Sequence, residues 1–238
     1  MKGSEMPNMD SFLVIGHRGA CGYEPENTLR SFEKAIALGA HMVELDVHRC
    51  RTGELVVIHD NRLERTTNGS GYVAEKTLDE LRALDAGGGE RIPLLREVVE
   101  RVGVRAAINI ELKGAGTAGP VSELIERTVG SGGYDTSHFL VSSFDHRELA
   151  RFAEINRRVR IGALVEGVPL GLAAFAQELG AFAVNAGLDF VTDEFVADAH
   201  RRGMRFFVYT VNHPEDIDRM RRMGVDGIFT NYPDRASP

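Results

Sequence analysis

The segment FLVIGHRGACGYEPENTLRSFEKAIALGAHMVELDV, residues 12–47, contains a complete strand–helix–strand pattern. Two short apolar runs, Phe12 to Gly16 and Met42 to Val47, are typical of buried strands. Between them, Asn27 to Leu38 has apolar side chains at helical spacing, polar residues for capping at its start and Gly39 just after its end. Because a helical crossover joins parallel strands, the segment predicts the first unit of a parallel α/β fold.

The same alternation continues along the chain. The further strands expected are Ala106 to Leu112, Phe139 to Ser143, Ile161 to Val165, Ala181 to Asn185, Arg205 to Thr210 and Gly227 to Thr230. The helical stretches between them include His146 to Asn156, Asp193 to Arg202 and Pro214 to Met223. Eight strands with right-handed crossovers predict a (β/α)8 TIM barrel, as one domain over residues 1–238. Only NYPDRASP follows the last strand, so the eighth helix is expected to be missing or vestigial.

One apolar run, Leu55 to His59, does not fit this alternation. Only the short segment RTGE precedes it, whereas a parallel partner needs a crossover of a dozen or more residues. The run is therefore expected to form an extra antiparallel hairpin strand with Met42 to Val47, with His59 opposite Asp46. Residues 61 to about 91 contain no barrel strand, and we expect an insertion there that covers the substrate.

The amino-acid composition and net charge limit the classes of function that this protein can have. The net charge of −7 argues against nucleic acid as the main partner, although a few local cations still admit a small phosphate ester. No apolar run approaches the roughly 18 residues of a membrane span. The first residues, MKGSEMPNMD, lack the apolar core of a secretory signal, so a cytoplasmic location is expected. Cys21 and Cys50 are too few for a disulfide framework, and the sequence leaves open whether they interact. It does not determine the oligomeric state.

Three carboxylates occur near the carboxyl ends of predicted strands, where parallel barrels place functional residues. Glu44 and Asp46 are two residues apart and point to one face, and Glu111 ends the next barrel strand. Burying three unpaired charges is costly, and Lys113 can neutralise only one of them. All-oxygen ligation favours one divalent cation, Mg²⁺ or Ca²⁺. The alternative is that each acid pairs with a core arginine or lysine.

Two histidines are expected beside this cluster. His17 follows the first strand and His59 ends the hairpin. Imidazole titrates near neutral pH, so the pair is expected to act as general acid and base, although either alone would be typical of a structural histidine. Arg18 and Lys113 are expected to neutralise phosphate oxygens and developing charge, and Phe144 is expected at the mouth of the substrate site.

Several of these residues belong to segments that resemble the glycerophosphodiester phosphodiesterase family. The segments are GHRGACGYEPENT (residues 16–28), VELDVHRCRTGELVVIHD (residues 43–60) and NIELK (residues 109–113). The later segments VSSFDH, YTVN and DGIFTNYPD also resemble that family in order, so the resemblance spans Ile15 to Asp234. The combination of motifs is specific, although no single motif is.

The resemblance implies the same roles: acid and base for the histidines, metal ligation for the acids, and phosphate contacts for Arg18 and Lys113. It implies cleavage of deacylated phospholipids to glycerol 3-phosphate and an alcohol, and hence a place in lipid and glycerol metabolism. The glycerol 2-hydroxyl would attack phosphorus, and water would open the resulting cyclic phosphate. Tyr209 stands where the family often has tryptophan, and Asn231 where aspartate is common. Neither departure is expected to touch the acid, the base or the metal ligands.

Two alternative functions stay open. A lysophospholipase D-like or phosphoinositide-type phosphodiesterase would need a broad apolar mouth near Phe144 and the insertion. A barrel that binds a phosphorylated ligand without turnover would not need the histidine pair.

Overall fold

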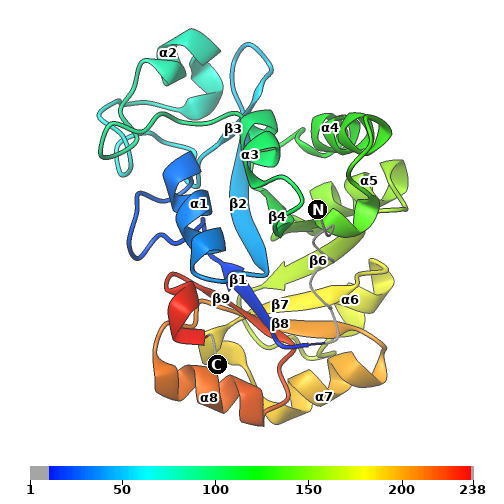
Figure 1. Ribbon diagram of the computed structural model, residues 1–238. Helices are drawn as coiled ribbons and strands as arrows, with labels where there is room; N and C mark the ends of the chain where they lie inside the picture. The colour runs from blue at the N-terminus through cyan, green and yellow to red at the C-terminus, as the bar shows by residue number, and fades with distance from the viewer. Residues whose placement is uncertain (1–10, 237–238) are drawn as a thin grey trace.

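The computed structural model describes residues 11–236, which form a closed barrel of parallel strands surrounded by helices (Figure 1). The strands are β1 (Leu13–Gly16), β2 (Met42–Arg49), β3 (Leu55–Val57), β4 (Ala107–Leu112), β5 (Phe139–Ser143), β6 (Arg160–Val165), β7 (Ala183–Gly187), β8 (Arg205–Tyr209) and β9 (Gly227–Thr230). β1 pairs with both β2 and β9 and so closes the barrel, whereas β3 pairs with β2 alone. The predicted (β/α)8 barrel with one extra strand is confirmed.

The helices follow the predicted alternation. They are α1 (Leu29–Ala37), α2 (Leu78–Arg82), α3 (Leu95–Val102), α4 (Ala118–Gly130), α5 (His146–Ile155), α6 (Ala174–Glu178), α7 (Asp193–Arg201) and α8 (Pro214–Arg222). Short 3-10 turns are η1 (Val73–Glu75), η2 (Thr136–His138), η3 (Leu188–Phe190) and η4 (Pro233–Ala236). η4 is all that follows β9 within the described residues, in agreement with the expected loss of the last helix. In residues 11–236, no helix combines the length and apolarity that a membrane crossing requires.

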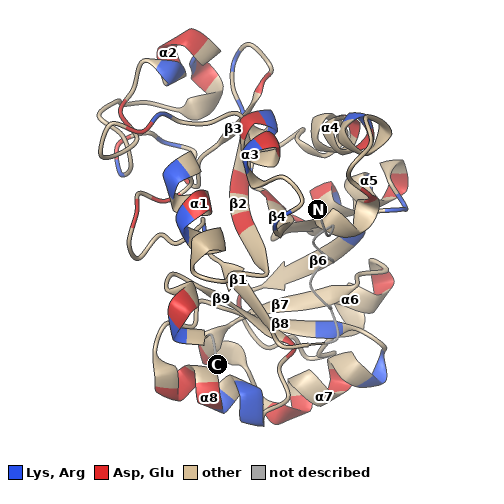
Figure 2. Ribbon diagram, in the orientation of Figure 1, with Lys and Arg blue, Asp and Glu red and all other residues tan. Residues whose placement is uncertain are grey.

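The barrel interior changes character along its axis. An apolar layer fills its amino-terminal end, made of Leu13, Ile15, Met42, Ala107, Leu140, Ala183, Phe207 and Phe229. Polar side chains, including the predicted carboxylates, come from later positions of the same strands. Outside the strands, a larger apolar layer packs the helices against the barrel, and most charged residues lie on outer helices and loops (Figure 2). The closed apolar layer leaves the carboxyl end as the side on which a site can open.

The β2–β3 hairpin is antiparallel as predicted, but its register differs by one residue. The backbone N–H of Ile58 donates to the carbonyl of Asp46, so Ile58 lies opposite Asp46 and the predicted pairing with His59 is wrong. The cause is the turn: it has three residues, 51–53, and Gly53 adopts a φ of 103°. His59 consequently lies beyond the end of β3.

The insertion packs beside the hairpin (Figure 1). It has its own small apolar cluster with β3 and the segment before α3, made of Cys50, Val56, Ile58, Leu63, Val73, Leu81, Ala86, Ile92 and Leu94. The cluster fixes residues 61–91 against the strand that precedes His59.

Because the layer inside the barrel is closely packed, shortening one of its side chains should destabilise the protein. Phe207 is fully buried in this layer, and Phe207→Ala should lower the free energy of unfolding by about 3–5 kcal/mol because it leaves a cavity. Ile155→Ala, at a side chain that is 56% exposed, is the control and should change it by about 0.5 kcal/mol or less. Chemical denaturation measures both. Equal effects of the two substitutions would contradict this account of the core.

Candidate active site

A cavity of about 580 Å³ opens at the carboxyl ends of the strands. Its lining residues are His17, Arg18, Glu44, His59, Asn109, Glu111, Lys113, Phe144, Leu164, Glu166, Tyr209, Thr210 and Phe229. Of the residues predicted for the site, only Asp46 does not line the cavity, and it is buried beside it. No lining residue comes from the insertion at 61–91, whose contact with the site is indirect.

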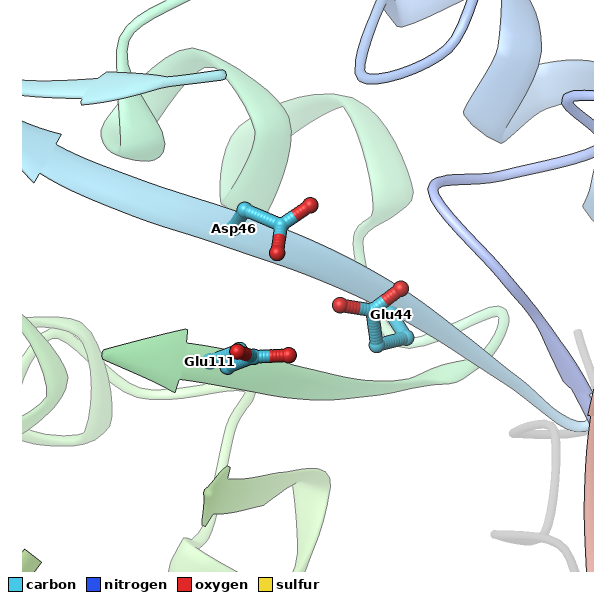
Figure 3. Close-up of side chains that lie close together, drawn as sticks. All are labelled: Glu44, Asp46 and Glu111. Carbon is cyan, nitrogen blue, oxygen red and sulfur yellow. The ribbon is translucent and has the colours of Figure 1, made fainter. Parts of the chain in front are cut away.

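The three predicted carboxylates converge at the inner end of the barrel mouth, where Glu44 and Glu111 line the cavity and Asp46 lies buried beside it. Glu44 and Asp46 extend from β2 and Glu111 from the neighbouring β4 (Figure 3). All three are buried, and ligand oxygens of the three lie within 4.8 Å of one another. The strand register explains this, since Asp46 pairs with Glu111 and Glu44 lies two residues earlier on the same face.

The surrounding groups leave part of this charge without a partner. Lys113 Nζ lies 3.1 Å from Glu111 Oε1, and Arg18 Nε lies 3.5 Å from Asp46 Oδ2. Glu44 accepts a hydrogen bond of 2.8 Å from the backbone N–H of Arg18. Asp46 Oδ1 is buried without a hydrogen-bond partner. Pairing with cations, the alternative to metal binding, therefore accounts for only part of the cluster, and the oxygen donors fit a hard divalent cation.

Burial also shifts the acid–base chemistry of the cluster. Burial and the negative charges of Asp46 and Glu111 raise the pKa of Glu44 well above its ordinary value. Burial and Asp46 raise the pKa of Glu111 to about 7, against the opposing charges of Lys113 and Arg18. The acidic cluster can therefore hold a metal ion, but protons compete for it below neutral pH.

The loop after β1 folds back to hold this cluster. Arg18 adopts a φ of 51°, and its carbonyl accepts from the Asn27 N–H, while the Asn27 side chain donates to Asp46 Oδ2 at 2.9 Å. Gly19 has a φ of 83°, and a Cβ there would lie 2.4 Å from Ser31 Oγ. Only glycine fits this close approach, which directs the Arg18 N–H toward Glu44.

His17 contacts Asn231, a residue that the sequence did not predict to belong to the site. Its Nδ1 lies 2.8 Å from Asn231 Oδ1, so the Nδ1 hydrogen donates and Nε2 keeps a lone pair. Desolvation, with the Arg18 charge adding to it, lowers the pKa of His17 to about 4. The expectation that Asn231 does not touch the acid or the base is wrong, because the last strand brings it to His17 across the closure of the barrel.

His59 also lines the cavity, and it contacts two charged side chains. Its Nδ1 lies 2.6 Å from Asp60 Oδ1, and its Nε2 lies 3.2 Å from Lys113 Nζ. The two rings therefore differ in the partner of Nδ1, which is a carboxylate for His59 and a neutral amide for His17. Lys113 Nζ also lies 5.6 Å from the centre of the Phe144 ring, so the predicted phosphate and mouth residues are neighbours.

Several partners of the predicted residues were missed from the sequence. They are Glu26, which binds Arg18; Asn27, which binds Asp46; Asp60, which binds His59; Arg65, which binds Glu26 and Asp60; and Asn231, which binds His17. Asp60 directly follows His59, which was a usable signal. The others depend on loop folding. Cys21 and Cys50 are free thiols, and no disulfide joins them.

The chain is similar to known proteins of one enzyme family. A sequence model of the glycerophosphoryl diester phosphodiesterase family matches residues 17–235. A glycerophosphodiester phosphodiesterase of Caldanaerobacter subterraneus is 37% identical, covering 93% of this chain and 95% of that protein. One of Bacillus altitudinis is also 37% identical, covering 94% and 96%. The structure of an Oleispira antarctica phosphodiesterase in complex with the product sn-glycerol-3-phosphate superposes with a TM-score of 0.85 at 29% identity, covering 94% of each chain.

A parallel barrel with an acidic cluster and two histidines at its carboxyl end, together with these relatives, defines a phosphoric diester hydrolase. The chain belongs to the glycerophosphoryl diester phosphodiesterase family. As an enzyme of this family, it is not a barrel that only binds a phosphorylated ligand.

The raised pKa of Glu111 predicts how pH affects the metal-free protein. Between pH 4.5 and about 7, the folded chain binds more protons at Glu111 than the unfolded chain does, so the free energy of unfolding should decrease as pH rises through this window. Glu111→Gln removes the buried charge and should raise the Tm of the metal-free protein at pH 8. It should also weaken the Tm increase that Mg²⁺ or Ca²⁺ produces.

Thermal melts with and without each cation, from pH 5 to pH 8, measure both effects. Glu123→Gln is the control, because Glu123 pairs with Arg127 at an exposed position on α4. A Glu111→Gln variant with the full cation-induced increase in Tm would exclude Glu111 as a ligand.

Proposed function

We propose that this enzyme hydrolyses glycerophosphodiesters to glycerol 3-phosphate and an alcohol. The observation that supports this most directly is the arrangement of an acidic cluster and two histidines around one cavity of about 580 Å³. The size suits a small-molecule substrate. The glycerol 3-phosphate in the Oleispira antarctica structure supports the same product here. The net charge of −7 is unfavourable for nucleic acid, and the free thiols Cys21 and Cys50 agree with a cytoplasmic location.

Glu44, Asp46 and Glu111 would hold one divalent cation, either Mg²⁺ or Ca²⁺. Their oxygen-only donor set and the unpartnered Asp46 Oδ1 support this assignment. When bound, the cation would supply Lewis-acid stabilisation of charge on the phosphate.

Arg18 and Lys113 would bind the phosphate oxygens. Both side chains line the cavity and already contact the acidic cluster. A guanidinium and an ammonium on either side of the acids can neutralise the charge that develops during phosphoryl transfer. Phe144, next to Lys113, would contact the part of the substrate that points out of the cavity.

His17 and His59 would move the protons. As the glycerol 2-hydroxyl attacks phosphorus, its proton must pass to one ring, and the departing alcohol oxygen must receive a proton from the other. The bond between phosphorus and the departing oxygen breaks, and a cyclic phosphate remains. Water then opens it with the two roles reversed. The different partners, Asn231 for His17 and Asp60 for His59, make the rings non-equivalent.

One observation favours a second candidate substrate, a lysophospholipid. Phe144 is 41% exposed and packs edge-on against Tyr209 at a ring distance of 5.7 Å. This aromatic wall could accommodate an acyl chain. The insertion does not extend it, because no lining residue comes from residues 61–91. A glycerophosphodiester therefore remains the first candidate.

The histidine pair predicts a specific kinetic pattern. His17→Ala or His59→Ala should each lower kcat by about 10²–10⁴-fold while the cation-induced Tm increase remains. The double variant should lose much less than the product of the two single losses, because the rings act as a unit. The wild-type rate should be bell-shaped in pH. Near-normal turnover by either single variant, with the cation effect intact, would exclude two-histidine catalysis.

A substrate panel separates the two candidates. Glycerophosphodiesters with choline, ethanolamine and inositol headgroups, and a lysophospholipid, should be assayed with Mg²⁺, Ca²⁺ and Mn²⁺. Release of glycerol 3-phosphate should depend on the cation and stop with a chelator. A kcat/KM that is higher for the lysophospholipid than for every glycerophosphodiester would favour the second candidate.

A further inference from the structure

One side chain of the insertion joins two parts of the site that are far apart in sequence. Arg65 donates through Nη1 and Nη2 to the two carboxylate oxygens of Glu26, each at 2.8 Å. The same guanidinium donates through Nε and Nη2 to the two oxygens of Asp60, at 2.7 and 2.9 Å. Arg65 therefore binds two carboxylates, each through two hydrogen bonds. Glu26 comes from the loop after β1 and Asp60 from the end of the hairpin.

Each of these carboxylates contacts a residue of the proposed machinery. Glu26 Oε1 lies 2.9 Å from Arg18 Nη1, and Asp60 Oδ1 lies 2.6 Å from His59 Nδ1. The contacts form one continuous chain from the phosphate-binding Arg18 through Glu26, Arg65 and Asp60 to His59. The planar guanidinium fixes the two carboxylates relative to each other, because each pair of bonds defines an orientation as well as a distance.

We propose that Arg65 is a positioning residue that sets the geometry of His59 and Arg18 toward the substrate phosphate. The inference rests on the roles proposed above for His59 and Arg18. It gives the insertion a function: its apolar cluster anchors residues 61–91 against β3, and Arg65 extends from this anchored segment to the site. The insertion thereby acts on catalysis without covering the cavity.

A direct role in binding substrate does not fit the geometry. Arg65 does not line the cavity, and its Nε, Nη1 and Nη2 atoms all donate to carboxylates. A purely stabilising role does not fit well either. The Arg65 side chain is 47% exposed, and ion pairs at such positions contribute little to stability. The role that remains for Arg65 is to orient the carboxylates of Glu26 and Asp60.

Arg65→Gln tests the inference, with Arg62→Gln as its matched control. Arg62 lies on the same insertion, is 50% exposed, pairs with Glu64 and lies over the Tyr72 ring. Loss of Arg65 should lower kcat by about 10- to 100-fold, because misplaced catalytic groups are costly. Arg62→Gln should stay within about 2-fold of the wild type. Both variants should keep their Tm within about 4 °C and their cation-induced Tm increase.

A double-variant cycle tests whether Arg65 acts through His59. In a His59→Ala background, the effect of Arg65→Gln on kcat should shrink by at least about 5-fold, since residues that act together are not additive. Two results would overturn the inference: near-normal kcat for Arg65→Gln, or an undiminished effect in that background. If the proposed function itself is wrong, the result is different: the His59→Ala single variant would remain active.

Arg65→Lys provides the test if Arg65→Gln does not fold. It keeps the charge and most of the aliphatic stem but cannot bind two carboxylates at two points each. If orientation is the role of Arg65, Arg65→Lys should still lose kcat by at least about 5-fold, with KM changed less than kcat. Full activity of the lysine variant would show that charge alone suffices and would overturn the inference.

Discussion

The rest of the site depends on the close approach of three buried carboxylates. Ligand oxygens of Glu44, Asp46 and Glu111 lie within 4.8 Å of one another inside the barrel mouth, an arrangement that is costly without compensating positive charge. Its surroundings supply part of that compensation through a backbone N–H, an amide and two cations. The apolar layer below closes the barrel, so the cavity beside the cluster opens at the carboxyl ends of the strands. The repulsion that destabilises the metal-free cluster would be relieved by a bound cation.

The barrel supplies the carboxylates, and its loops supply the groups around them. The loop after β1 provides His17 and Arg18, and the hairpin provides His59. Loops have more freedom than strands, so their side chains need partners to hold them. Asn231 holds His17 across the closure of the barrel, and Asp60 holds His59. Because one partner is a neutral amide and the other a carboxylate, two identical rings acquire different electrostatic environments.

The local patterns predicted most of the fold and the main site residues. The period of two along β2 placed Glu44 and Asp46 on one face, and parallel pairing with β4 brought Glu111 beside them. The same reasoning was less accurate at the hairpin. A three-residue turn shifted the register by one, because Gly53 allows a positive φ that the sequence count did not include.

The sequence alone determined the alternation of strands and helices, the extra hairpin strand, and the residues that lie at the strand ends. These follow from periodicity, which acts between residues close in the chain. Only the tertiary structure decided which partner each side chain of the candidate site has. Asn231 lies 214 positions from His17, and Arg65 lies 39 from Glu26, yet each pair is in hydrogen-bond contact. Barrel closure and the packing of the insertion create these contacts, and neither leaves a periodic signal in the chain.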